Sequence, residues 1–349
     1  MRKSSVSRYF LRKIKICALV ATVWTLPVSA SADTKTLQDM TGVVSELPVR
    51  PAHIADLWYA HNELLVMLGG ASAIAMTVER ESMSPWMYRL APALHAATQL
   101  PSTTPTAETL LAGHVDLVFA TPSLSGVESY RKTGIPTVGV EFHDTAGLLR
   151  CLDLTASILG TDHAQKVAQD YRTYLEETEK TLATRLADIP EASRPRVLHI
   201  LSVSPMKVDG AGTMIDEWIR LAGGRNAAGE IKGSKRPISL EQIAAWNPDI
   251  IILGGMSGDA EPKTDGPVWK ELKAVKNGKV YRNPVGAFPW DRYGTEFALQ
   301  IQWAATVIHP ELFHDTDMVE ITRAFYRRFF SYDLTQDEAR RILAAQPPA

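Results

Sequence analysis

Large aromatic and cationic side chains follow the predicted strands at the points where parallel sheets bind ligands. The residues that we expect to contact a ligand are Trp58, Tyr59, His61, Arg80, Trp86, Tyr88, Met206, Arg236, Trp290 and Arg292. Aromatic faces provide apolar contact, and guanidinium groups form charge-assisted hydrogen bonds with anions. This combination predicts a bulky, partly anionic metal chelate as the ligand, and a ferric siderophore fits it best. Tyr59 or His61 could then complete the coordination sphere of the iron.

Some of these residues also have a purely structural interpretation, because tryptophans commonly pack in cores and Asp291 with Arg292 could form a local salt bridge. The nine histidines are isolated from one another, so we expect no site for a bare divalent ion, which needs three or four ligands at short range. An exported hydrolase using Ser204 or Ser257 is the enzyme alternative, but no catalytic triad is legible around either serine. We therefore expect a binding protein with no intrinsic cofactor.

One segment of the first half recurs 133 positions later in the chain. Residues 106–120 and 239–253 each begin with Thr or Ser, continue through an amphipathic stretch, and reach an aspartate (Asp116, Asp249) followed by four apolar residues. A hydroxyl residue is typical of a helix N-cap, and a short apolar run bounded by turns is typical of a buried parallel strand. Both halves are therefore expected to be open parallel α/β sheets, which bind ligands beyond the carboxyl ends of their strands.

Residues 161–190 separate these halves and are predicted to form one long helix. Thr161 and Asp162 are N-cap residue types, apolar residues recur at helical spacing from Ala164 to Leu186, and Pro190 ends the run. At 1.5 Å per residue such a helix is a rod of about 40 Å. Two sheets joined by a rigid rod are expected to face their strand-end loops across a cleft.

Residues 1–32 are typical of a secretory signal peptide. They hold six basic residues and no acidic ones, and an apolar run from Ile16 to Val28 precedes a small-residue cleavage site. This run is too short to cross a membrane, and Cys17 does not lie in a lipoprotein box, so we expect periplasmic export without a lipid anchor. The remaining chain has 31 basic and 39 acidic residues, and a net charge near −8 argues against a nucleic-acid partner.

Several stretches together resemble one known family, the exported substrate-binding proteins of ABC importers for iron–siderophore, haem and cobalamin. The resemblance runs from about Arg50 to Phe330, and it rests on Arg50-Pro-Ala-His-Ile-Ala-Asp-Leu, the two repeated segments, the linking helix and Gly278-Lys-Val-Tyr. It implies two Rossmann-like α/β lobes with mainly parallel sheets, joined by one long rigid α-helix, with a ligand cleft between the lobes. The predicted parts are a signal peptide (1–32), an N-terminal lobe (33–160), the linking helix (161–190) and a C-terminal lobe (191–349).

The resemblance also implies a partner. In this family one surface glutamate of each lobe docks onto arginines of the membrane permease, and Glu108 and Glu241 occupy these positions in the repeated segments. A purely local role at two helix N-termini is the alternative. We expect a monomer that delivers a metal chelate to an ABC permease, and a ligand sensor built on the same cleft is a further alternative. Cobalamin would rest on Trp58, Trp86 and Trp290, whereas haem would use Tyr59 and His61 as axial ligands.

Overall fold

The computed structural model describes residues 33–256 and 266–349. The predicted signal peptide and the candidate nucleophile Ser257 lie outside these ranges. Residues 33–349 form one compact unit, so the lobe boundaries at residues 160 and 190 stay predictions. Within the described ranges, no helix combines the length and the apolar character needed to cross a bilayer.

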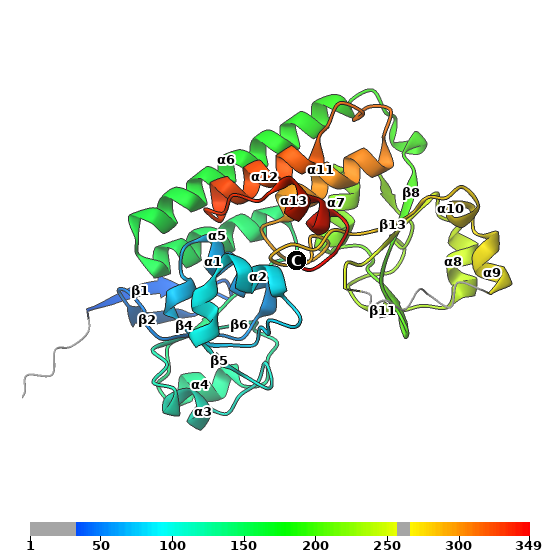
Figure 1. Ribbon diagram of the computed structural model, residues 1–349. Helices are drawn as coiled ribbons and strands as arrows, with labels where there is room; N and C mark the ends of the chain where they lie inside the picture. The colour runs from blue at the N-terminus through cyan, green and yellow to red at the C-terminus, as the bar shows by residue number, and fades with distance from the viewer. Residues whose placement is uncertain (1–32, 257–265) are drawn as a thin grey trace, which may run out of the picture. The chain divides into compact units, whose positions relative to one another are not determined.

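The first lobe, which holds the strands labelled β4, β5 and β6 in Figure 1, is built on a parallel sheet with the order β5-β4-β3-β6-β7. The strands are β3 (Ile54–Asp56), β4 (Ile74–Thr77), β5 (Thr98–Gln99), β6 (Leu117–Ala120) and β7 (Thr137–Gly139). The helices are α1 (Tyr59–Met67), α2 (Pro85–Leu90), α3 (Ala107–Ala112), α4 (Val127–Lys132) and α5 (Thr145–Leu159), with the short 3₁₀ turns η1 (Ala71–Ala73) and η2 (Pro92–Ala96). The strand order reverses between β3 and β6, which is where open α/β sheets bind ligands.

The second lobe has a mainly parallel sheet with the order β11-β9-β8-β12-β13. Its strands are β8 (Arg196–Val203), β9 (Met206–Val208), β10 (Arg225–Asn226), β11 (Arg236–Pro237), β12 (Ile250–Leu253) and β13 (Val280–Arg282). In the described part of this sheet the antiparallel pairs are β8 with β9 and β9 with β11. The helices are α7 (Met214–Leu221), α8 (Leu240–Trp246), α9 (Pro267–Glu271), α10 (Lys273–Lys276), α11 (Phe297–Ile308), α12 (Met318–Phe329) and α13 (Gln336–Leu343). The predicted fold class is confirmed.

The predicted long helix is α6 (Asp162–Arg185), which runs beside α5 and α11 in Figure 1. Thr161 caps it by accepting a hydrogen bond from the backbone N–H of Ala164 at 3.1 Å. The helix ends five residues before Pro190, and the turn η3 (Glu191–Ser193) follows. Tyr171, fully buried on its inner face, donates a hydrogen bond to the carbonyl of Thr295 at 2.6 Å. Because α6 packs on α5 of the first lobe and on α7 and α11 of the second, it braces both lobes.

A hairpin of β1 (Thr34–Gln38) and β2 (Val44–Pro48), not anticipated from the sequence, precedes the first sheet. The ammonium group of Lys35 donates to the carbonyl of Ile158 at 2.8 Å, near the C-terminus of α5. Unpaired carbonyls at a helix C-terminus favour a cation. The hairpin is therefore anchored to the end of α5.

The repeated segments have the same structure in both lobes. Thr106 caps α3 and Ser239 caps α8, each through a hydrogen bond from the third residue of the helix. Asp116 accepts hydrogen bonds from the backbone N–H groups of Ala52 (2.8 Å) and His53 (3.1 Å), just before β3. Asp249 accepts one from Arg196 at 2.8 Å, at the start of β8. The aspartate of each repeat thus holds the first strand of its own lobe.

We expect Asp116→Ala and Asp249→Ala each to lower the free energy of unfolding by about 1–2 kcal/mol, because backbone donors at the start of a central strand lose a charged acceptor. Urea denaturation followed by circular dichroism measures this loss. Asp153→Ala is the matched control, since Asp153 forms an exposed ion pair with Arg172 and exposed pairs contribute little. A loss no larger than that of the control would show that the aspartates do not hold the strands.

Candidate ligand-binding cleft

Two adjoining cavities lie at the carboxyl ends of both sheets. The smaller, of about 240 Å³, is lined by Tyr59, Glu79, Met83 and Ser84 of the first lobe and by Leu201, Lys235, Gly254, Met256, Phe288, Pro289, Asp291 and Arg292 of the second. The larger, of about 390 Å³, is lined by Trp58, Tyr59, Ala60, Thr121, Ser123, Glu141, Phe142 and His143 of the first lobe and by Ser234, Lys235, Phe288, Arg292 and Tyr293 of the second. Tyr59, Lys235, Phe288 and Arg292 line both cavities. Together the two cavities form one cleft between the lobes.

A larger hollow, of about 480 Å³, lies elsewhere in the molecule. It is walled by helices α6, α11 and α12 and by the chain from 313 to 317, with Tyr174, Leu182 and Phe313 among its lining residues. No residue that follows a strand of either sheet lines it. Since open α/β sheets bind ligands beyond their strand ends, we place the candidate site in the cleft despite its smaller cavities.

Trp58, Tyr59 and Arg292 are the three predicted ligand contacts that line the cleft. Trp58 precedes the first turn of α1 and packs against Phe142, with ring centroids 5.0 Å apart. Tyr59, the first residue of α1, lies where both cavities meet. The expected aromatic surface therefore exists, although it is smaller than predicted.

Four other predicted contacts are buried in the core, and for them the prediction is corrected. Trp86 donates to the carbonyl of Gln346 (2.9 Å), Tyr88 to that of Glu79 (3.0 Å), and Trp290 to Glu296 Oε1 (2.8 Å). His61 hydrogen-bonds with Asp56 (2.7 Å) and Thr155 (2.9 Å). His61 on α1 and Trp86 and Tyr88 on α2 point inward because these helices form in the stretches that follow β3 and β4. Because His61 is buried, it is not placed to ligate haem in the cleft. Because Trp86 and Trp290 are buried, they do not form a surface for cobalamin.

The last three predicted contacts also line neither cavity, which corrects the prediction for them. Arg80 and Arg236 are exposed outside the cleft, the latter on the edge strand β11. Met206 on β9 packs against the core of the second lobe. The cationic residues of the cleft are instead Lys235 and Arg292.

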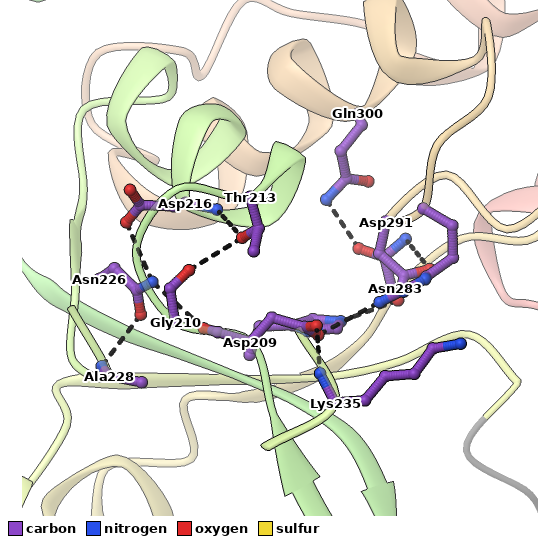
Figure 2. A network of polar contacts seen from close by, with 12 residues as sticks. Asp209, Gly210, Thr213, Asp216, Asn226, Ala228, Lys235, Asn283, Asp291 and Gln300 are labelled. Atoms are coloured by element: carbon purple, nitrogen blue, oxygen red, sulfur yellow. Dashed lines mark hydrogen bonds and ion pairs between the residues drawn. The ribbon is translucent and has the colours of Figure 1, made fainter. Parts of the chain in front are cut away.

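A buried charge network lies directly beneath the second-lobe wall of the cleft. Fully buried His199 hydrogen-bonds through Nδ1 with Asp209 (3.1 Å) and through Nε2 with Asp291 (2.8 Å). Arg292, 12% exposed, donates to the same oxygen of Asp209 at 3.2 Å. Figure 2 shows Lys235 beside Asp209, with its backbone N–H donating to Oδ1 at 3.0 Å. The network therefore holds the guanidinium group of Arg292 and the backbone of Lys235.

The pKa values in this network favour its charged forms. Burial acts to lower the pKa of His199, but hydrogen bonds with Asp209 and Asp291 outweigh burial and raise it to about 9. Burial also acts to raise the pKa of Asp209, but His199 and Arg292 bring it down to about 2. Near neutral pH the positive charges of His199 and Arg292 therefore offset the negative charges of Asp209 and Asp291. Arg292 consequently offers an anion less net attraction than its sequence position suggests.

A second buried cluster joins the lobes at the base of the cleft. Glu63 of α1 accepts a hydrogen bond from the backbone N–H of Thr295 at 2.7 Å. The adjacent Glu296 accepts from the backbone N–H of Phe288 (2.8 Å) and from Trp290. Both carboxyl groups are buried, and sequence reasoning missed them, although two acidic residues beside apolar helical runs were a signal. Glu63 links the lobes, and Glu296 holds the segment that carries Phe288 into the cleft.

This cluster predicts that stability depends on pH. Burial and the neighbouring charge of Glu296 raise the pKa of Glu63 to about 8. Burial raises the pKa of Glu296 to about 7. Between pH 4.5 and 8 the folded protein thus keeps protons that the unfolded chain has released, so its stability falls as the pH rises through this range. We expect a loss on the order of 2 kcal/mol or more, and a shallower slope in Glu63→Gln.

Urea denaturation at pH 5, 6, 7 and 8 measures this slope in both proteins. His199 also loses stabilising charge above pH 6.5, as the pH approaches its pKa of about 9, but it does so in both proteins. The difference between them therefore reports the titration of Glu63 together with its coupling to Glu296. Parallel slopes would mean that Glu63 is already ionised at pH 5.

Comparison with known proteins identifies relatives of similar architecture. A family model described as periplasmic binding protein matches residues 54–285. The molybdate-binding protein MolA of Haemophilus influenzae is 30% identical over 165 residues, which cover 46% of each chain. The Fe(3+)-citrate-binding protein YfmC of Bacillus subtilis is 31% identical over 111 residues, which cover 31% of this chain and 35% of the relative. The match thus spans less than half the length of each of these relatives.

Solved structures agree over a longer span. The Haemophilus influenzae MolA structure with bound molybdate has a TM-score of 0.76 at 21% identity, covering 86% of this chain and 99% of that one. A Helicobacter pylori CeuE structure described as a nickel–histidine complex has a TM-score of 0.72 at 20% identity, covering 89% and 99%. At these identities the likeness establishes the fold and leaves the ligand open.

Proposed function

Because the chain belongs to the periplasmic binding protein family, we propose that it is the substrate-binding component of an ABC importer and captures an anionic metal chelate between its lobes. The observation that carries this proposal is the cleft, whose two cavities share four lining residues drawn from both lobes. A ligand seated there would touch the strand ends of both sheets. The proposal involves reversible binding and no covalent step.

A ferric siderophore is the first candidate ligand. Trp58 and Tyr59 of the first lobe and Phe288 of the second supply aromatic surface, and Lys235 and Arg292 of the second lobe supply positive charge. Such a pairing suits a chelate with flat apolar groups and anionic oxygens. The phenol of Tyr59, at the junction of the cavities, is the group that we propose as an additional iron ligand.

A bare oxyanion is the second candidate. The cavity of about 240 Å³ holds the cations Lys235 and Arg292, which are donors suited to a compact, multiply charged anion. The molybdate-binding relative supports this candidate by sequence and by fold. The larger adjoining cavity, which such an ion would leave empty, favours the chelate.

Delivery requires a surface that meets the permease. Glu108 on α3 and Glu241 on α8 are exposed residues at matching positions of the structural repeat, one in each lobe. Hydrogen bonds at the helix N-termini lower the pKa of both, so both are charged near neutral pH. We propose that they pair with arginines of the membrane subunits.

Tryptophan fluorescence with a panel of ferric siderophores, ferric citrate, molybdate, haem and cobalamin tests the ligand class. We expect saturable quenching by at least one ferric chelate, and we expect this quenching to be reduced in Trp58→Phe. Quenching should be unchanged in Trp246→Phe, because Trp246 on α8 packs in the core of the second lobe, away from the cleft. Saturation by molybdate alone would select the oxyanion. The absence of saturable binding to every member of the panel would refute the proposal.

A further inference from the structure

Glu79 lies in the smaller cavity, two residues beyond the end of β4, and its side chain is held in a fixed position. It is 1% exposed. Ser84 donates a hydrogen bond to Oε2 of Glu79 at 2.6 Å. The backbone N–H of Glu79 donates to Thr77 Oγ1 at 3.0 Å, and the backbone carbonyl of Glu79 accepts from Tyr88 at 3.0 Å. Among the described residues, Oε1 has no hydrogen-bond partner. A buried polar atom without a partner at the wall of a cavity is costly unless a ligand satisfies it.

The charges around Glu79 favour its neutral form. The titratable or charged residues that face it are Asp56 and Tyr88 in the first lobe and Lys235, Asp291 and Arg292 across the cavity. No described cation lies within ion-pair distance of its carboxyl group, and Asp56 is engaged by His61 while Arg292 is engaged by Asp209. Burial above all raises the pKa of Glu79 to about 7, with a further contribution from Asp56.

We propose that Glu79 binds the ligand as a neutral carboxylic acid, with its Oε1 hydroxyl donating a hydrogen bond to an oxygen of an anion attracted by Lys235 and Arg292. An ionised carboxylate at this place would repel the anion, whereas the acid supplies the donor that completes the wall opposite the two cations. This inference rests on the proposed function and narrows its ligand class to anions with exposed oxygen acceptors. Bound ligand and proton are then coupled, so the protein takes up a proton when it binds above the pKa of Glu79.

Isothermal titration calorimetry with sodium molybdate and with ferric citrate as probes tests this coupling. At pH 8, in buffers of different ionisation enthalpy, we expect the wild type to take up nearly one proton per bound anion and Glu79→Gln to take up none. Above pH 7 the wild-type affinity should fall about tenfold per pH unit, because only the protonated form binds. Glu79→Gln keeps a neutral donor at this position, so its affinity should vary with pH only as the probe itself does.

Glu81→Gln is the matched control, since Glu81 is an exposed glutamate of the same loop and should behave as the wild type. Proton uptake by the wild type can be measured even if Glu79→Gln does not fold. Binding without proton uptake, an equal pH slope in both proteins, or a wild-type affinity that rises with pH would overturn the inference and leave the proposed function intact. If neither molybdate nor ferric citrate binds at any pH, the inference is wrong, because it requires an anion with exposed oxygen acceptors as the ligand. The wider fluorescence panel then tests the proposed function separately.

Discussion

In vesicles that contain the cognate permease and ATPase, we expect the double variant Glu108→Lys/Glu241→Lys to reduce ligand uptake by about tenfold or more. Each substitution places a cation opposite the arginines that we propose as partners, and like charges across an interface cost several kcal/mol. Both side chains are exposed, so the fold should be unaffected. Ligand affinity should also be unchanged, because neither residue lines the cleft.

Uptake of radiolabelled metal, measured beside calorimetric ligand affinity, separates docking from binding. The matched control is Glu128→Lys/Glu271→Lys, which reverses the charge of one exposed glutamate in each lobe. Neither of these residues lies on α3 or α8. Normal transport by the first variant, or an equal loss in the control, would contradict the assignment of the docking pair. Separate single variants would show whether both lobes contribute.

We expect His199→Leu to destabilise the protein by about 3–5 kcal/mol, the usual cost of removing one partner from a buried ion pair. Asp209 would keep Arg292, but Asp291 would remain buried, and among the described side chains it would keep one hydrogen bond, from Asn283 at 3.5 Å. Because the pKa of His199 is raised to about 9, its stabilising charge is fully present below pH 6.5 and is lost as the pH rises through 9. The loss should therefore be largest near pH 6.

Chemical denaturation at pH 6 measures this loss against His309→Leu. His309 is also buried, but its side chain hydrogen-bonds with the carbonyl of Gly223 at 3.0 Å, and the carboxylate of Glu311, 3.4 Å from its Nδ1, is exposed. Its replacement should cost about 1 kcal/mol. Equal losses in the two variants would mean that the network does not depend on the charge of His199.

Local patterns in the sequence predicted most of the fold. The capped apolar runs of the repeat and the periodicity of α6 depend on residues close in the chain, and the structure confirms both. The hairpin β1–β2 has short strands with half-exposed residues, and this gives little periodic signal. Capped helices and buried strands were therefore predictable from the sequence, whereas this hairpin was not.

The position of the candidate site was also predictable, but the direction of its side chains was not. The rule that ligands bind at strand ends led to Tyr59 and Arg292, which line the cleft. His61 lies only two residues after Tyr59 but points into the core, because α1 starts directly after Trp58. Glu79 was overlooked because its chemistry depends on the residues across the cavity, which are distant in sequence.

Crystal structures of the protein with a bound ferric chelate and with molybdate, located by the anomalous signal of the metal, test the central claim most directly. We predict one strong peak in the cleft, within reach of Tyr59, Lys235 and Arg292 and contacted by both lobes. A peak in the hollow between α6 and α12, or metal bound only at the surface of one lobe, would contradict capture between the two sheets.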